Sequence, residues 1–216
     1  MGWLNNAFYQ SKSETEYVVM ANNFAVHSIG NSIATFLRNA YQTSDLNAIF
    51  PECTIRSISS GELAGQEEIT STLSLFLYRI SINEHLRNVR RELTSGRFEV
   101  PLSLDLHFLL TAWFTRTDAE QTIMSWAMQQ IYEHPTLSIA SLSPDGGWRD
   151  GDVVQLIPAE LSNEDIMRIW DALQPAYRLS FSYTARVVRI DGAERNAESE
   201  PVVANSFRLS DLEGAT

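Results

Sequence analysis

The chain has 216 residues, a formal net charge of −11, 44% hydrophobic residues and 10% aromatic residues. This length and composition predict one globular domain whose core needs neither disulfides nor a metal. The acidic charge argues against binding to nucleic acid or to an anionic membrane surface, and no apolar run reaches the roughly 18 residues of a membrane span.

The N-terminal segment shows no secretion signal, because it has no charged region followed by an apolar core. Met20 is an alternative start of translation to Met1, and we expect residues 1–21 to form a flexible extension. The single cysteine, Cys53, excludes a disulfide within the chain and is interpreted as a small buried residue.

The first half of the chain predicts one long helix and two strands. Residues 22–42 have apolar positions at helical spacing, with Asn22 or Asn23 as N-cap and with Gly30 placed for close packing against a strand. Residues 53–59 predict a short strand, and residues 59–68 a hydrophilic loop. The segment 69–86 predicts an inner strand with Leu73, Leu75 and Leu77 on one face and Phe76, Tyr78, Ile80 and Ile82 on the other.

The segment Pro101–Phe114 is the strongest strand signal. Leucines and other apolar residues recur at every second position, which is the period of a strand with one buried face. The opposite face begins with Ser103, Asp105 and His107 and becomes apolar toward Trp113. We interpret this segment as the central strand of the domain. The preceding residues, 83–96, predict an exposed hairpin or loop that carries several arginines.

The second half predicts two helices and two further strands. Asp118–His134 is a helix capped by Thr117, residues 141–152 form a loop, and residues 153–158 form a strand. Ser162–Leu173 is a helix whose capping box joins Ser162 and Asp165. Residues 177–190 predict a long one-sided strand. The tryptophans at positions 113, 126 and 170 have core-facing spacing.

The sequence contains no motif that names catalytic, cofactor-binding or metal-binding residues. Glycine-rich phosphate loops, nucleophile elbows and paired His or Cys motifs are all missing. Asp105 and His107 share one strand face, as an acid–base pair requires, but a polar pair on an amphipathic strand is more often solvated or interfacial. We therefore predict a protein that is not an enzyme, with an unrecognised hydrolase as a weaker alternative.

Three long blocks, residues 73–88, 101–114 and 160–191, occur in this order with WAMQQIYEHPTL between the second and the third. Together they resemble the N-terminal domain of the tail-terminator, or cap, protein of phage-tail-like contractile injection systems. The resemblance covers residues 22–191. It implies an α/β (α+β) fold with a mixed or antiparallel sheet of four to five strands flanked by two to three helices. It also implies no enzymatic activity and no cofactor.

The resemblance further implies a cap subunit that forms a hexameric ring, ends the inner tube and the sheath, and stabilises the extended sheath. The expected partners are further copies of the chain, the sheath protein and the inner tube protein. The protein would be made in the cytoplasm and then join the particle. Residues 192–216 would form a flexible or strand-donating tail. The alternative is an adaptor that binds a particle component or cargo without closing a ring.

A ring needs two different patches that meet head to tail. The sequence offers an arginine-rich segment before the central strand and the polar face of the last strand. It is equally compatible with the sequence that both surfaces only face water and contact no partner. The predicted interface residues are Arg87, Arg90, Arg91, Arg178, Ser180, Thr184 and Arg186.

Overall fold

The computed structural model describes residues 22–65, 68–86, 91–92, 98–173 and 175–190. Six strands within these ranges form one sheet in the order β1-β2-β5-β8-β7-β6. Their bounds are β1 Thr54–Ile58, β2 Thr72–Ile82, β5 Leu102–Trp113, β6 Thr136–Ser138, β7 Val153–Ala159 and β8 Ser180–Ile190. Only β1 and β2 run parallel, so the sheet is mixed, as predicted, with more strands than the predicted four to five.

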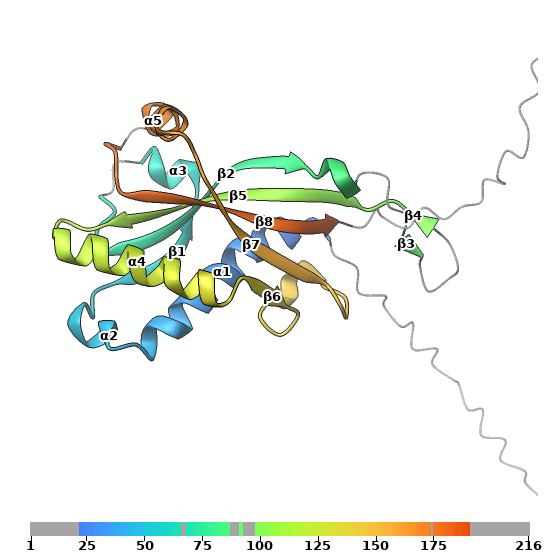
Figure 1. The fold of residues 1–216 in the computed structure, drawn as a ribbon, viewed down its shortest axis with the longest axis horizontal. Helices are drawn as coiled ribbons and strands as arrows, with labels where there is room; N and C mark the ends of the chain where they lie inside the picture. The colour runs from blue at the N-terminus through green and yellow to red at the C-terminus, as the bar shows by residue number, and fades with distance from the viewer. Residues whose placement is uncertain (1–21, 66–67, 87–90, 93–97, 174, 191–216) are drawn as a thin grey trace, which may run out of the picture.

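The helices lie on the two faces of this sheet (Figure 1). We call the face covered by α1 (Ala25–Gln42) and α4 (Thr117–Glu133) the inner face, and the face that carries α3 (Ser60–Leu63) and α5 (Asn163–Ala172) the outer face. The remaining elements are short: α2 (Leu46–Ile49), the 3-10 turns η1 (Glu84–Leu86) and η2 (Pro144–Gly146), and a separate pair of strands, β3 (Arg91–Glu92) and β4 (Phe98–Glu99).

β5 is the central strand that its alternation predicts. It pairs with β2 on one side and with β8 on the other. Its alternate residues from Leu104 to Ala112 are buried in the core between the inner face and the two long helices. Burying a leucine or phenylalanine side chain contributes about 1.5–3 kcal/mol, so this row of side chains anchors the fold.

Helix α1 buries one stripe of side chains against the sheet, including Ile29, Ile33 and Leu37. A Cβ added to Gly30 would stand 3.0 Å from Ser57 Oγ, which confirms the predicted close approach of this helix to a strand. The predicted asparagine cap is wrong, because the N-cap is Phe24. Asn22 Oδ1 instead accepts a hydrogen bond from the Phe24 amide at 2.8 Å.

The other two cap predictions differ in outcome. Ser162 is the N-cap of α5 and accepts from the Asp165 amide at 3.1 Å, as predicted, but the capping box is not reciprocal, because the Asp165 carboxylate accepts from Ser162 Oγ, at 2.6 Å, and not from the Ser162 amide. Thr117 does not cap α4, because the helix already begins at this residue and Arg116 takes the preceding position. A threonine within helical backbone cannot place its hydroxyl over the free amides of the first turn.

Two segments predicted as loops contain more structure. Residues 59–68 include α3, which the Ser59 and Glu62 side chains cap reciprocally. In residues 141–152 the Trp148 side chain is buried, and its indole N–H lies 2.9 Å from the Ser143 carbonyl oxygen and 3.1 Å from Ser28 Oγ. This contact fixes the loop against α1.

The core prediction for the tryptophans is confirmed. Trp113 and Trp170 are each 4% exposed, and Trp126 is partly buried against the main core. None of the helices in the described ranges is both long enough and apolar enough to cross a bilayer.

Candidate functional site

The outer face of the sheet has two halves of different character. At one end, α3 and α5 cover an apolar cluster in which Trp113 and Trp170 meet edge to face at 5.8 Å between ring centroids. The Trp113 indole donates to Ser74 Oγ at 2.7 Å, so its polar atom is satisfied inside this cluster. The cluster extends along β5 only as far as Leu109.

Beyond Leu109 the outer face is polar across β2, β5 and β8. We call this region the polar strip. Its buried floor consists of Asn83, Ser103 and Asp105, and longer side chains surround the floor. The complete set is Arg79, Ser81, Asn83, Ser103, Asp105, His107, Thr184, Arg186 and Arg189.

Both neighbours of β5 change register beside the strip. In β2 the register shifts between Leu77 and Arg79, which pair with Phe108 and His107, respectively. In β8 the shift lies opposite Asp105. Each bulge inserts an extra residue and sharpens the local twist of the strand.

The bulge in β2 overturns one prediction. Ile80 and Ile82 pair with Leu106 and Leu104, so they lie on the inner face and not with Phe76 and Tyr78. One extra residue in a strand moves all later side chains to the other face. It therefore also brings Arg79 and Ser81 to the outer face, beside His107 and Asp105.

Asp105 is the buried charge of the strip, with 7% of its surface exposed. The Asn83 side-chain amide donates to both carboxylate oxygens, at 3.0 and 3.1 Å, and Arg186 Nε donates to Oδ2 at 3.2 Å. A buried carboxylate needs such donors, because an unpaired charge in the interior is strongly destabilising. This network ties β2, β5 and β8 together.

His107 is held by two hydroxyl groups. Its Nε2 lies 2.8 Å from Ser81 Oγ, and its Nδ1 lies 3.2 Å from Thr184 Oγ1. Burial lowers the pKa of His107 below its usual range, the charge of Arg79 lowers it further, and Asp105 opposes this shift. The imidazole is therefore neutral at pH 7, when one ring nitrogen donates and the other accepts.

The same geometry does not form an acid–base dyad. Asp105 and His107 share the outer face, as predicted, but each has other hydrogen-bond partners, and no hydrogen bond joins the two. A catalytic carboxylate orients the imidazole by accepting from one of its ring nitrogens, and here both nitrogens face hydroxyl groups.

The predicted interface residues of the last strand all lie on the outer face. Arg178 stacks over the Trp113 ring at 6.0 Å, and Ser180 Oγ lies 3.0 Å from Thr111 Oγ1, whereas Thr184 and Arg186 belong to the polar strip. Their role in an interface stays a prediction.

The arginine-rich segment is largely beyond the described ranges. Arg87 and Arg90 lie outside them, and Arg91 begins β3 with only its backbone described. The sequence pattern missed the contributions of Arg79, Asn83 and Arg189 to the strip, because their faces depend on the two bulges.

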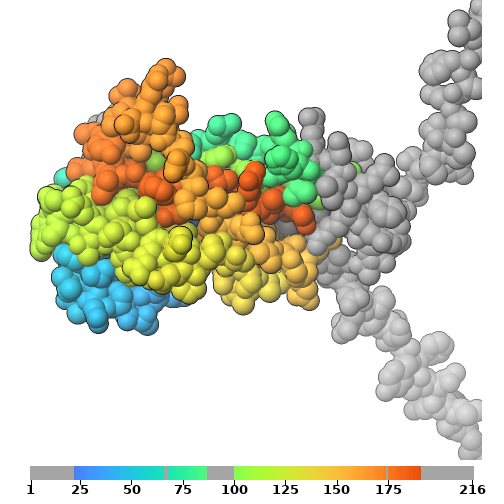
Figure 2. Space-filling view, viewed as in Figure 1, coloured from blue at the N-terminus to red at the C-terminus, as the bar shows by residue number. Residues whose placement is uncertain are grey.

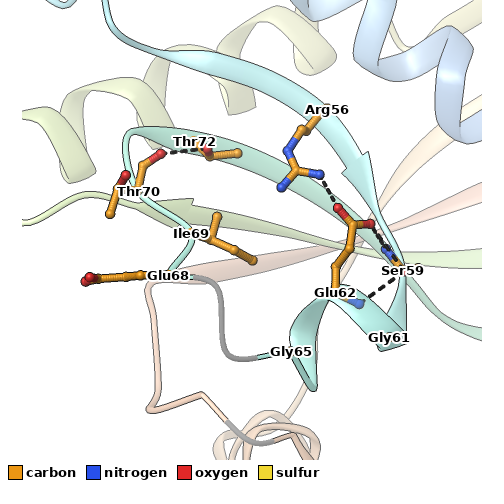
Figure 3. Close-up of a pocket in the computed structure, with 9 residues that line it drawn as sticks. All are labelled: Arg56, Ser59, Gly61, Glu62, Gly65, Glu68, Ile69, Thr70 and Thr72. Carbon is orange, nitrogen blue, oxygen red and sulfur yellow. Dashed lines mark hydrogen bonds and ion pairs between the residues drawn. The ribbon is translucent and has the colours of Figure 1, made fainter.

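A pocket of about 660 Å³ lies beside α3 (Figure 3). Arg56 forms an ion pair with Glu62, whose carboxylate also accepts from the Ser59 amide at 2.9 Å. These contacts hold the pKa of Glu62 below its usual range. Arg56 and Glu62 thus fasten the short helix to β1 and occupy one another's charged groups.

The described part of the chain contains neither a cluster of metal ligands nor an activated cysteine thiol. No group of three His, Cys, Asp or Glu side chains there is placed to hold a metal ion. Cys53 is only partly buried against the core, not fully buried as predicted. This burial still raises the pKa of its thiol to about 11, so the thiol is protonated near neutral pH and is a poor nucleophile.

The comparisons with known proteins agree on one type of domain. The model of the Pvc16 N-terminal domain family matches residues 28–204, which is more than half of the chain. No curated protein matches the sequence.

Two solved structures share the fold. The sheath/tube terminator of the extracellular contractile injection system PVC, in its extended state, matches with a TM-score of 0.53 and 19% identity over 88% of this chain and 65% of that chain. The anti-feeding prophage cap, a tube-terminating cap, matches with a TM-score of 0.55 and 19% identity over 84% of this chain and 60% of that one. The chain thus spans less than two thirds of the length of either structure.

Proposed function

The chain belongs to the Pvc16 N-terminal domain family, and on this premise we propose that it is a terminator, or cap, subunit of a contractile injection system. The observation that carries the proposal is the family match over residues 28–204, together with a fold shared with two tube-terminating proteins. The cap is a structural protein, and its partners are the inner tube and the sheath.

In this proposal six copies close a ring on the last tier of tube and sheath. A ring stops the growth of a tube when it presents a six-fold surface that binds the final subunits and offers no site for the next ones. The protein is made in the cytoplasm and then becomes part of the assembled particle. The outer face supports this role, because its polar strip is a surface of fixed, hydrogen-bonded charges that can specify one partner geometry.

Co-assembly with the tube and sheath proteins of the same particle tests the proposal. We expect particles made with the chain to have a narrow length distribution and a six-fold density at one end in electron micrographs. Particles made without it should vary in length and lose their sheath more readily.

Two results would contradict the proposal. One is a normal length distribution in the absence of the chain. The other is a pull-down that recovers cargo but neither tube nor sheath protein, which would establish the adaptor function instead. As a control, an unrelated acidic domain of similar size is added in place of the chain. It should leave the length distribution of the particles unchanged.

A further inference from the structure

The polar strip is cationic although the chain as a whole is strongly acidic. It holds three arginines, Arg79, Arg186 and Arg189, against the single carboxylate of Asp105, while His107 is neutral at pH 7. Of these three arginines, Arg186 alone forms an ion pair with the Asp105 carboxylate. Arg79 and Arg189 form no ion pair within the described ranges, and Arg79 is exposed. The strip therefore has two guanidinium groups available for carboxylates of a partner.

Helix α5 presents the opposite charge. Its buried side carries Trp170, which packs on Trp113, and its exposed side carries Glu164, Asp165 and Asp171. The one cation on this side, Arg168, is already paired with Glu164. Met167 is 45% exposed among these charges and adds an apolar contact area. The exposed side thus has three carboxylates against one guanidinium group.

These two surfaces cannot meet within one copy. Both lie on the outer face, but α5 packs over Trp113 at one end of β5, whereas the strip surrounds Asp105 at the other. Eight residues of strand separate these positions, or roughly 26 Å at about 3.3 Å per residue. Figure 2 shows α5, in orange, projecting from the body of the domain at its own end. A helix that projects in this way is accessible to a second copy.

We propose that the exposed side of α5 of one copy lies on the polar strip of the next copy. The contact joins two different patches of the same chain, so it is head to tail and generates a ring when the rotation between copies closes. In each copy, α3 and α5 leave one half of the outer face uncovered, and helix α5 of the neighbouring copy covers that half. This inference rests on the proposed ring and identifies the surfaces that build it.

Reciprocal charge reversal tests the pairing. The strip variant is Arg79→Glu with Arg189→Glu, the helix variant is Glu164→Arg with Asp171→Arg, and a third chain carries all four changes. The helix variant has a matched control, Asp45→Arg with Glu133→Arg, which makes the same change of net charge at exposed positions outside α5 and the strip. Self-association is measured by sedimentation velocity and mass photometry over a range of concentrations, and circular dichroism checks that each variant is folded.

We expect the strip and helix variants each to weaken self-association by at least about tenfold, as for close charge pairs at other interfaces. The four-fold variant should return to within about threefold of the unaltered chain, since every pair is then attractive again. The control should associate like the unaltered chain.

Several results would overturn the inference without touching the proposed function. These are normal association of either two-site variant, or no recovery in the four-fold variant. A strip variant that self-associates normally but no longer binds tube or sheath would assign the strip to another partner. The inference is also overturned if the unaltered chain stays monomeric at every concentration, with or without tube. The cap function is then tested separately by the particle-length assay.

Discussion

Replacing Asp105 by alanine probes the interaction that joins the three central strands. The carboxylate accepts from the Asn83 amide at 3.0 and 3.1 Å, and without it this amide, on a residue only 3% exposed, has no acceptor. Leaving a buried donor unsatisfied costs about 1–3 kcal/mol, and hydrogen bonds to charged groups contribute about 1.5–3 kcal/mol. Arg186, whose side chain is 41% exposed, returns to water and adds less than about 1 kcal/mol.

We therefore expect Asp105→Ala to lower the free energy of unfolding by about 3 kcal/mol. For a domain of this size, that corresponds to a Tm lower by roughly 6–12 °C. Urea unfolding followed by tryptophan fluorescence, together with calorimetry, measures both quantities. Asp45→Ala, which removes an exposed carboxylate, is the control and should change stability by less than about 0.5 kcal/mol.

The double variant Asn83→Ala with Asp105→Ala identifies the cause. Because it removes donor and acceptor together, its cost should be at least about 1 kcal/mol smaller than the sum of the two single variants. Asn83→Ala alone also loses the hydrogen bond from the Leu86 amide to Oδ1, at 3.1 Å, so it is not neutral. The reasoning is refuted if Asp105→Ala is as stable as the unaltered chain, or if the two single costs simply add.

Three further predictions concern single sites. Because the pKa of His107 is lowered on folding, its protonation opposes the native state, so stability should fall as the pH drops below about 6.5; His107→Gln should flatten this slope in urea titrations between about pH 7.5 and 5, and an unchanged slope would contradict the assignment. Gly30→Ala should be neutral or destabilising because its Cβ would crowd Ser57 Oγ, whereas in a Ser57→Ala background the same change should stabilise by up to about 1 kcal/mol in thermal unfolding. The Cys53 thiol, with its pKa of about 11, should react with iodoacetamide near pH 8 about a hundredfold more slowly than an unfolded control, and equal rates would show that it is not protected.

The elements that sequence reasoning predicts well are those with a strong period and clear ends. The alternation between Leu102 and Ala112 identifies β5 because one face of that strand is buried from Leu104 to Ala112, and only Leu102 at its start is exposed. Ser162 identifies the start of α5 because its hydroxyl has a local role, the capping of the Asp165 amide, that needs no tertiary contact. Each of these signals lies entirely within its own segment of the sequence.

The polar strip could be predicted only in part, because two strand bulges determine it. Alternation correctly places Asp105 and His107 on one face, and Thr184 and Arg186 on one face. It assigns Ile80 to the wrong face, since the extra residue in β2 arises from pairing with β5 and leaves no trace in local composition. The short strand β6, with Leu137 as its one buried residue, could not be predicted either, because three residues are too few to show an alternation.

The position of β8 in the sheet has a consequence for synthesis. β6 and β7 reach the rest of the sheet only through β8, which lies between β7 and β5. Until residues 180–190 have left the ribosome, the nascent chain holds two separate pieces of sheet. The backbone groups on the edge of β5 that pairs with β8 then have no partner strand. A truncation before Ser180 should therefore aggregate during translation instead of yielding a smaller folded domain.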